Sequence, residues 1–137
     1  MMKWIKRSIL LFSYITLTAC TTEMGLRDEF DKSMKSYNRM LRWHEVENAG
    51  MTYMEKELRD DFMKHAEGLK KRGVTLTDFR ILTSECLPEK KSGEVIAEFD
   101  YFILPSNRIK TITYRQEWVY QEIIKGWKLK SGLPVFD

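Results

Sequence analysis

The chain has 137 residues, a length that fits one domain with a core large enough to fold without disulfides or metal. Its formal net charge is +3, and the first 19 residues hold three of the 23 basic side chains and no acidic one. The remaining 118 residues therefore have 20 side chains of each sign. A domain without surplus positive charge has no general attraction for phosphates, so nucleic acid is excluded as an expected partner.

The first 20 residues contain a basic segment, an apolar segment and then a cysteine. Lys3, Lys6 and Arg7 precede an apolar stretch of eleven residues, Ser8 to Thr18. This stretch is too short to span a membrane, which takes about 20 residues. The last two residues of this stretch and the two that follow are Leu17-Thr18-Ala19-Cys20, a sequence that resembles the lipobox of bacterial lipoproteins.

The resemblance implies that residues 1–19 are a signal peptide, removed by cleavage between Ala19 and Cys20. Cys20 would then carry a diacylglycerol on its sulfur and an N-acyl group such as palmitate, and no other cofactor is expected. Because Thr21 rather than aspartate follows the cysteine, the resemblance also implies an anchor in the outer membrane that faces the periplasm. The sequence therefore predicts a protein of the bacterial cell envelope, attached to a membrane by lipid.

Residues 20–27 are expected to be the lipidated cysteine and a short tether, and residues 28–137 a single folded domain. The seven residues after Cys20 reach about 25 Å at most when extended, which keeps the domain close to the bilayer. Acylation of Cys20 leaves Cys86 as the second, unpaired cysteine. No histidine lies near Cys86 in the sequence, so we expect an inert buried side chain rather than a reactive thiol.

A first helix is predicted from Asp28, where apolar side chains begin to recur every three or four residues. The sequence Asn48-Ala49-Gly50 is expected to end it, because asparagine and glycine tolerate positive φ. The predicted buried stripe is Phe30, Met34, Tyr37 and Leu41.

A second helix is predicted to open at Thr52, which forms a capping box with Glu55, and to end before Gly73. Residues 70–72 are all basic, which suits the negative end of the helix dipole. An alternative for these three residues is contact with anionic lipid headgroups. The predicted apolar stripe is Met54, Leu58, Phe62, Ala66 and Leu69.

After Gly73 the apolar period changes to two, which predicts strands over 74–87, 94–103, 111–120 and 127–129. A four-residue loop at 105–108 would place Phe99 opposite Tyr114, Val95 opposite Trp118 and Glu98 opposite Arg115. The side chains expected to face the helices are Val95, Ala97, Phe99, Tyr101, Ile103, Ile112, Tyr114, Gln116 and Trp118.

These elements predict an α+β domain in which two N-terminal helices pack on one face of a curved, four-stranded antiparallel sheet. The order resembles the cone-shaped nuclear transport factor 2-like (cystatin-like) superfamily, and small bacterial lipoproteins of that type without an assigned activity. The resemblance rests on residues 37–43, on Gln116-Glu117-Trp118 and on the ending with Trp127-Lys128-Leu129 and Leu133-Pro134-Val135-Phe136.

The superfamily resemblance implies that ligands or catalytic groups would lie inside the cone. Candidate cone-lining residues are Tyr37, His44, His65, Tyr101, Tyr114 and Trp118. The alternative is that the aromatic side chains form the core and that the two histidines are structural. No catalytic residue is assigned and no metal-ligand spacing is present, and Asp78 and Glu85 stay open as acids because the alternation around them is broken.

Three functions remain from this reasoning. The first is a membrane-anchored, non-enzymatic accessory or interaction domain that contacts an envelope protein. The second is a carrier of a small apolar molecule held in the cone, and the third is an enzyme of isomerase or dehydratase type. A packed cone would favour the first, because ligand sites usually have volumes of about 300–1,000 Å³.

Overall fold

The computed structural model describes the backbone of residues 2–137 and the side chains of residues 22–137. The side chains of the expected signal segment and of Cys20 thus lie outside the described part. The elements in chain order are α1 (Met2–Arg42), α2 (Val46–Tyr53), the 3-10 helix η1 (Lys56–Leu58), α3 (Arg59–Lys71), β1 (Val74–Leu87), the 3-10 helix η2 (Pro88–Lys90), β2 (Ser92–Ile103), β3 (Lys110–Gln121) and β4 (Gly126–Leu129).

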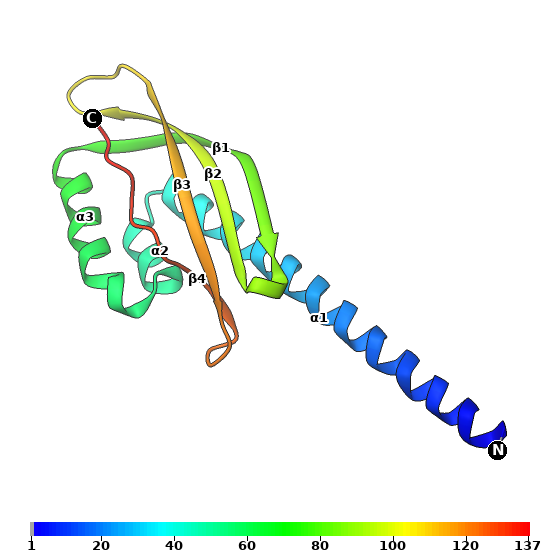
Figure 1. Ribbon diagram of the computed structural model, residues 1–137. Helices are drawn as coiled ribbons and strands as arrows, with labels where there is room; N and C mark the ends of the chain where they lie inside the picture. The colour runs from blue at the N-terminus through cyan, green and yellow to red at the C-terminus, as the bar shows by residue number, and fades with distance from the viewer. Residues whose placement is uncertain (1) are drawn as a thin grey trace.

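The four strands form one antiparallel sheet in the order β1-β2-β3-β4, and the sheet curves around the helices (Figure 1). The predicted α+β class and curved four-stranded sheet are confirmed. The prediction of two helices is wrong, because the described residues form three α-helices. Among the described residues, no helix combines the length and apolar character required to cross a bilayer.

The first helix ends at Arg42, eight residues before the predicted stop at Gly50. His44 adopts the left-handed conformation with φ of 65°, the position that glycine usually takes after a helix. The amides of His44 and Glu45 donate to the carbonyls of Leu41 and Met40, at 3.1 and 2.9 Å, which is the hydrogen-bond pattern of a Schellman motif. A histidine therefore ends α1, and the glycine at position 50 has another role.

Gly50 lies inside α2, where α2 packs closely on α3. A Cβ at Gly50 would lie 2.4 Å from the ring of Phe62, so only glycine lets the two helices approach this closely. Thr52 is also inside α2, and the structure has no capping box there. The prediction that Thr52 opens the second long helix is therefore wrong, and α3 begins instead at Arg59.

The end of α3 agrees with the prediction. Gly73 has φ of 73°, and its amide donates to the carbonyl of Lys70 at 3.2 Å. The β1 strand then covers the predicted range 74–87. The change in apolar spacing, from every three or four residues to every second residue, thus predicts the boundary between α3 and β1 correctly.

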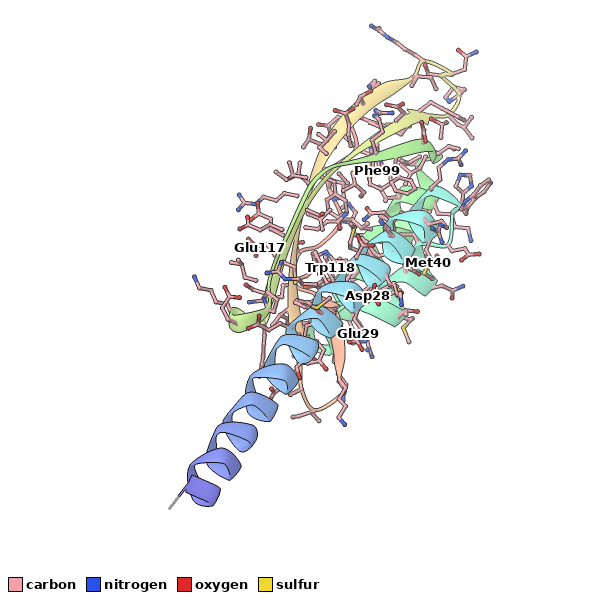
Figure 2. All side chains as sticks on the ribbon, turned by 90° about the vertical axis from the view of Figure 1, so that its right-hand side faces the viewer. Asp28, Glu29, Met40, Phe99, Glu117 and Trp118 are labelled. Atoms are coloured by element: carbon pink, nitrogen blue, oxygen red, sulfur yellow. The ribbon has the colours of Figure 1, made fainter. Side chains whose placement is uncertain are left out.

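The sheet register differs from the predicted one by two residues. Ala97 rather than Phe99 lies opposite Tyr114, and Gly93 rather than Val95 lies opposite Trp118. The loop is longer than expected because the end of β2 continues along β1, so that pairing with β3 stops at Tyr101. Since the shift is even, every side chain keeps its predicted face. Figure 2 shows Trp118 between the sheet and α1, and Glu117 on the other side.

The C-terminal segment after β4 completes the core. Leu133 and Phe136 are buried, and the ring of Phe136 packs edge-on against Tyr101 with 4.9 Å between centroids. The guanidinium of Arg72 donates to the carbonyl of Phe136 at 2.6 Å. The last residues of the chain thus lie across the end of α3 and the end of β2 (Figure 1).

Candidate functional site

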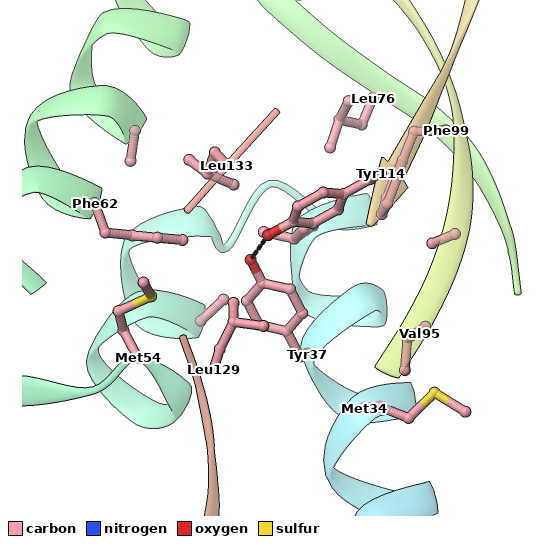
Figure 3. Close-up of a cluster of buried hydrophobic side chains, with 14 of the residues drawn as sticks. Met34, Tyr37, Met54, Phe62, Leu76, Val95, Phe99, Tyr114, Leu129 and Leu133 are labelled. Atoms are coloured by element: carbon pink, nitrogen blue, oxygen red, sulfur yellow. Dashed lines mark hydrogen bonds between the residues drawn. The ribbon is translucent and has the colours of Figure 1, made fainter. Parts of the chain in front are cut away.

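The space between the concave face of the sheet and the helices, here called the interior, is filled by side chains. Tyr37, Tyr114 and Trp118 are at most 2% exposed and belong to one hydrophobic core cluster. Figure 3 shows Tyr37 and Tyr114 in this cluster with Phe99 and Met34. The ring of Trp118 packs edge-on against Tyr37 at 5.6 Å between centroids. These three candidate residues therefore form part of the hydrophobic core.

Two tyrosines meet at the centre of the interior. The hydroxyl groups of Tyr37 on α1 and Tyr114 on β3 form a hydrogen bond of 2.8 Å (Figure 3). Burial raises the pKa of Tyr37 well above its usual value, and it raises the pKa of Tyr114 as well. Both phenols are therefore neutral at physiological pH, which makes them hydrogen-bonding groups rather than bases.

A second polar contact in the interior joins two amides. Asn38 and Gln116 are fully buried and exchange hydrogen bonds: Nδ2 of Asn38 donates to Oε1 of Gln116 at 3.2 Å, and Nε2 of Gln116 donates to Oδ1 of Asn38 at 2.6 Å. Nε1 of Trp118 also donates to Gln116 at 3.3 Å. Sequence reasoning placed Gln116 inward but missed Asn38. The signal was present, because Asn38 is four residues after Met34 on the same helical face.

Tyr101 lies at the end of the interior near the C-terminus. It is 4% exposed, and its hydroxyl donates to the carbonyl of Asp137 at 3.0 Å. Its polar group is thus used to hold the C-terminal segment. Tyr101 contributes to closing this end of the interior rather than to a site that is open to ligands.

The two histidines lie outside the interior, in different parts of the domain. His44 is exposed at the end of α1, and its Nε2 lies 3.1 Å from the carbonyl oxygen of Leu76, to which it can donate. His65 on α3 is half-buried beside a shallow hollow of about 230 Å³ that Asp61, Lys130 and Leu133 also line. The structure therefore does not bring the histidines together with the four interior aromatics.

A hollow of about 310 Å³, here called the mouth hollow, lies where α1, α2 and α3 meet the start of β1. Its walls are mostly apolar, and His44, Glu47 and Lys70 provide polar groups. The volume is at the lower limit of small-molecule sites. The other lining residues are Leu41, Val46, Ala66, Leu69, Gly73, Val74, Thr75, Leu76 and Leu104.

The outer face of the sheet carries a cluster of paired charges. The guanidinium of Arg80 donates to Glu98 at 2.7 Å and to Asp100 at 2.9 Å, and Thr111 also donates to Asp100 at 2.7 Å. Hydrogen bonds from Arg80 lower the pKa of Asp100 to about 2. The predicted partner of Glu98 was Arg115, and that pairing is wrong because of the register shift.

The remaining candidate acids also lie outside the interior. Arg115 pairs with Glu94 at 2.9 Å on the outer face. Asp78 and Glu85 are exposed on β1, and Oδ1 of Asp78 accepts a hydrogen bond from the amide of Phe79 at 2.8 Å. In the described part of the chain, no three histidine, cysteine or acidic side chains are grouped so that they could hold a metal ion.

Cys86 is half-buried near the end of β1, and partial burial raises the pKa of its thiol. A raised pKa reduces the thiolate fraction at neutral pH. The carbonyl of Cys86 accepts a hydrogen bond from Arg27 of α1 at 3.1 Å. Cys86 is thus less buried than expected, and its inertness stays a prediction.

Comparison with known proteins gives a similarity of fold. No family model and no curated protein matches the chain. The solution structure of a SEC-C motif containing protein from Rhodopseudomonas palustris is similar over 76% of this chain and 77% of that one, with a TM-score of 0.58 and 14% identity. The intermembrane space region of the chloroplast protein ARC6 matches 72% of this chain and 92% of that region, at a TM-score of 0.48 and 13% identity.

Proposed function

We propose that this protein is a lipoprotein of the bacterial cell envelope, attached through acyl groups on Cys20, whose domain acts as an accessory or interaction module. The observation that carries the proposal is the lipobox sequence that ends at Cys20, preceded by its basic and apolar segments. Outer-membrane residence, with the domain in the periplasm, is part of the proposal. The proposed fold group is the nuclear transport factor 2-like superfamily, which the helices on the concave face of the sheet support.

The packing of the interior supports an interaction module over an enzyme of isomerase or dehydratase type. Such an enzyme would need space for its substrate next to an acid or base. The centre of this interior is occupied instead by the Tyr37–Tyr114 and Asn38–Gln116 contacts, and every buried side-chain polar atom in the described region has a hydrogen-bond partner. This packing supports a function that lies on the surface of the domain and at its anchor.

A second candidate function is the binding of a small apolar molecule, which the mouth hollow favours. Its volume of about 310 Å³ and its leucine and valine lining suit a compact apolar ligand. Native mass spectrometry of the protein purified from its own host would detect such a molecule as added mass. Replacing Ala66 in the wall by leucine should reduce the amount bound, and an unchanged amount would place the ligand elsewhere.

The anchor is tested by replacing each cysteine in turn. Cys20→Ser should abolish incorporation of labelled palmitate and release the protein from the membrane fraction or leave it unprocessed. Cys86→Ser is the matched control and should keep both the label and the membrane association. Labelled, correctly processed Cys20→Ser protein would contradict the anchor. Inner-membrane fractionation of the wild type would contradict only the outer-membrane part of the proposal.

A further inference from the structure

Two hairpin turns lie together at the end of the domain where α1 leaves the sheet (Figure 1). One turn comprises residues 88–91 between β1 and β2, and the other comprises residues 122–125 between β3 and β4. The amide of Tyr120 donates to the carbonyl of Lys91 at 2.9 Å, and the side chain of Lys91 forms an ion pair with Glu122. The two turns therefore form one surface, here called the tip surface.

Helix α1 is fixed to this end of the domain by specific contacts. Nε1 of Trp127 donates to the carbonyl of Leu26 at 3.0 Å, and the guanidinium of Arg27 donates to the carbonyl of Cys86 at 3.1 Å. One turn later, the ring of Phe30 packs on Trp127 with 5.0 Å between centroids. The part of α1 that leads toward Cys20 thus leaves the domain beside the tip surface.

The distance from the tip surface to the proposed anchor is short. Residues 22–27, expected to be a tether, belong to α1. Thr22 and Leu26 are separated by about 6 Å along the helix axis. Cys20 and Thr22 are two Cα-to-Cα steps apart, which adds about 7 Å at most in any conformation. The acylated cysteine therefore holds Leu26 within about 13 Å of the bilayer. Leu26 in turn contacts Trp127, two residues after the end of the tip surface.

The tip surface combines exposed apolar side chains with three lysines (Lys90, Lys91, Lys125) and two glutamates (Glu89, Glu122), so its net charge is slightly positive. Ile123 is 99% exposed and Ile124 is 52% exposed, although both are large apolar side chains. Lys125 follows them directly, and the exposed Lys90 lies on the neighbouring turn. Apolar side chains beside lysines suit the headgroup layer of an anionic bilayer. The apolar side chains can insert next to the acyl chains, and the lipid phosphates attract the lysines.

We propose that the tip surface rests on the bilayer that holds the anchor, with Ile123 and Ile124 in the headgroup layer and Lys90 and Lys125 against anionic headgroups. This inference rests on the lipid anchor of the proposed function. It also fixes the orientation of the domain. The β2–β3 loop, which contains Ile109, lies at the other end of a strand of 12 residues and would point away from the membrane.

The experiment uses lipidated protein in vesicles of phosphatidylcholine and phosphatidylglycerol, with Cys86→Ser as the background. An environment-sensitive fluorophore is attached at Ile124→Cys or, as the control, at Ile109→Cys. The two isoleucines are 52% and 54% exposed, so the labels start from matched environments. Quenching by nitroxide-labelled lipid should be at least about threefold stronger at position 124 than at position 109. A third variant, Ile123→Cys, should behave like position 124.

Different failures have different meanings. Equal quenching at both ends in protein that floats with the vesicles would overturn the proposed orientation and leave the anchor intact. Protein that does not float would contradict the anchor and the inference that rests on it. A label at position 124 that is shielded in native envelopes but not in pure lipid would also overturn the proposal, because it would indicate a protein partner on the tip surface.

Discussion

The hydrogen bond between Tyr37 and Tyr114 gives a quantitative test of the packed interior. The two hydroxyls lie 2.8 Å apart, and the residues are 0% and 2% exposed. Removing either hydroxyl by a tyrosine-to-phenylalanine change leaves the other without its partner in a dry environment, which costs about 1–3 kcal/mol. Removing both leaves no unpaired group, so the double variant should lose little stability, and less than the sum of the single variants.

The assay is urea unfolding followed by circular dichroism for the wild type, the two single variants and the double variant. We expect a coupling free energy of at least about 1 kcal/mol between positions 37 and 114. Tyr120→Phe is the control, because Tyr120 is half-buried beside Trp127 and outside this pair; its change should stay within about 0.5 kcal/mol. Additive losses from the two single variants would refute a buried hydrogen bond between the two tyrosines.

Two further predictions concern the faces of the sheet. Trp118→Ala should destabilise the domain by about 3–5 kcal/mol because the side chain is 2% exposed, whereas Glu117→Ala on the opposite face should change stability by less than about 0.5 kcal/mol; equal, small losses in urea unfolding would contradict this assignment of the faces. Arg80→Gln should raise the pKa of Asp100 from about 2 toward its usual value, measured by carboxyl-carbon NMR titration. Because the folded-state pKa is lowered, this contribution to stability is present above about pH 4 and is lost as the pH falls toward 2; an unchanged pKa in the variant would show that Arg80 is not its cause.

The strands could be predicted because alternation in β2 and β3 records directly which side chains are buried. The register could not, because it depends on how far β2 continues along β1, which no local pattern shows. Because the register error is an even number of residues, each side chain is still predicted on its correct face, and Trp118 and Gln116 are correctly predicted to point inward. The same error assigned the wrong partner to Glu98, since charge pairs depend on which residues are opposite.

The helix boundaries failed for a different reason. Glycine was used as a stop signal, but Gly50 serves the close approach of α2 to Phe62, and His44 takes the left-handed position that ends α1. Local sequence does not distinguish a glycine required by packing from one required by φ. The mouth hollow depends on how three helices meet β1, so the placement of His44 at its edge, away from His65, follows from tertiary structure alone.

The positions of the hydrogen bonds and hollows connect the two proposals. The interior is closed by the tyrosine and amide pairs and, near Tyr101, by the C-terminal segment. The mouth hollow is lined by Gly73 and Leu104, whose backbones are joined by a hydrogen bond of 3.2 Å at the end of β2 opposite the tip surface. With the tip surface on the bilayer, the hollow and the β2–β3 loop would open toward the compartment. An envelope partner or a small apolar molecule would therefore approach the domain from the side away from the membrane, and residues 70–72, at the same end, would meet that partner rather than lipid headgroups.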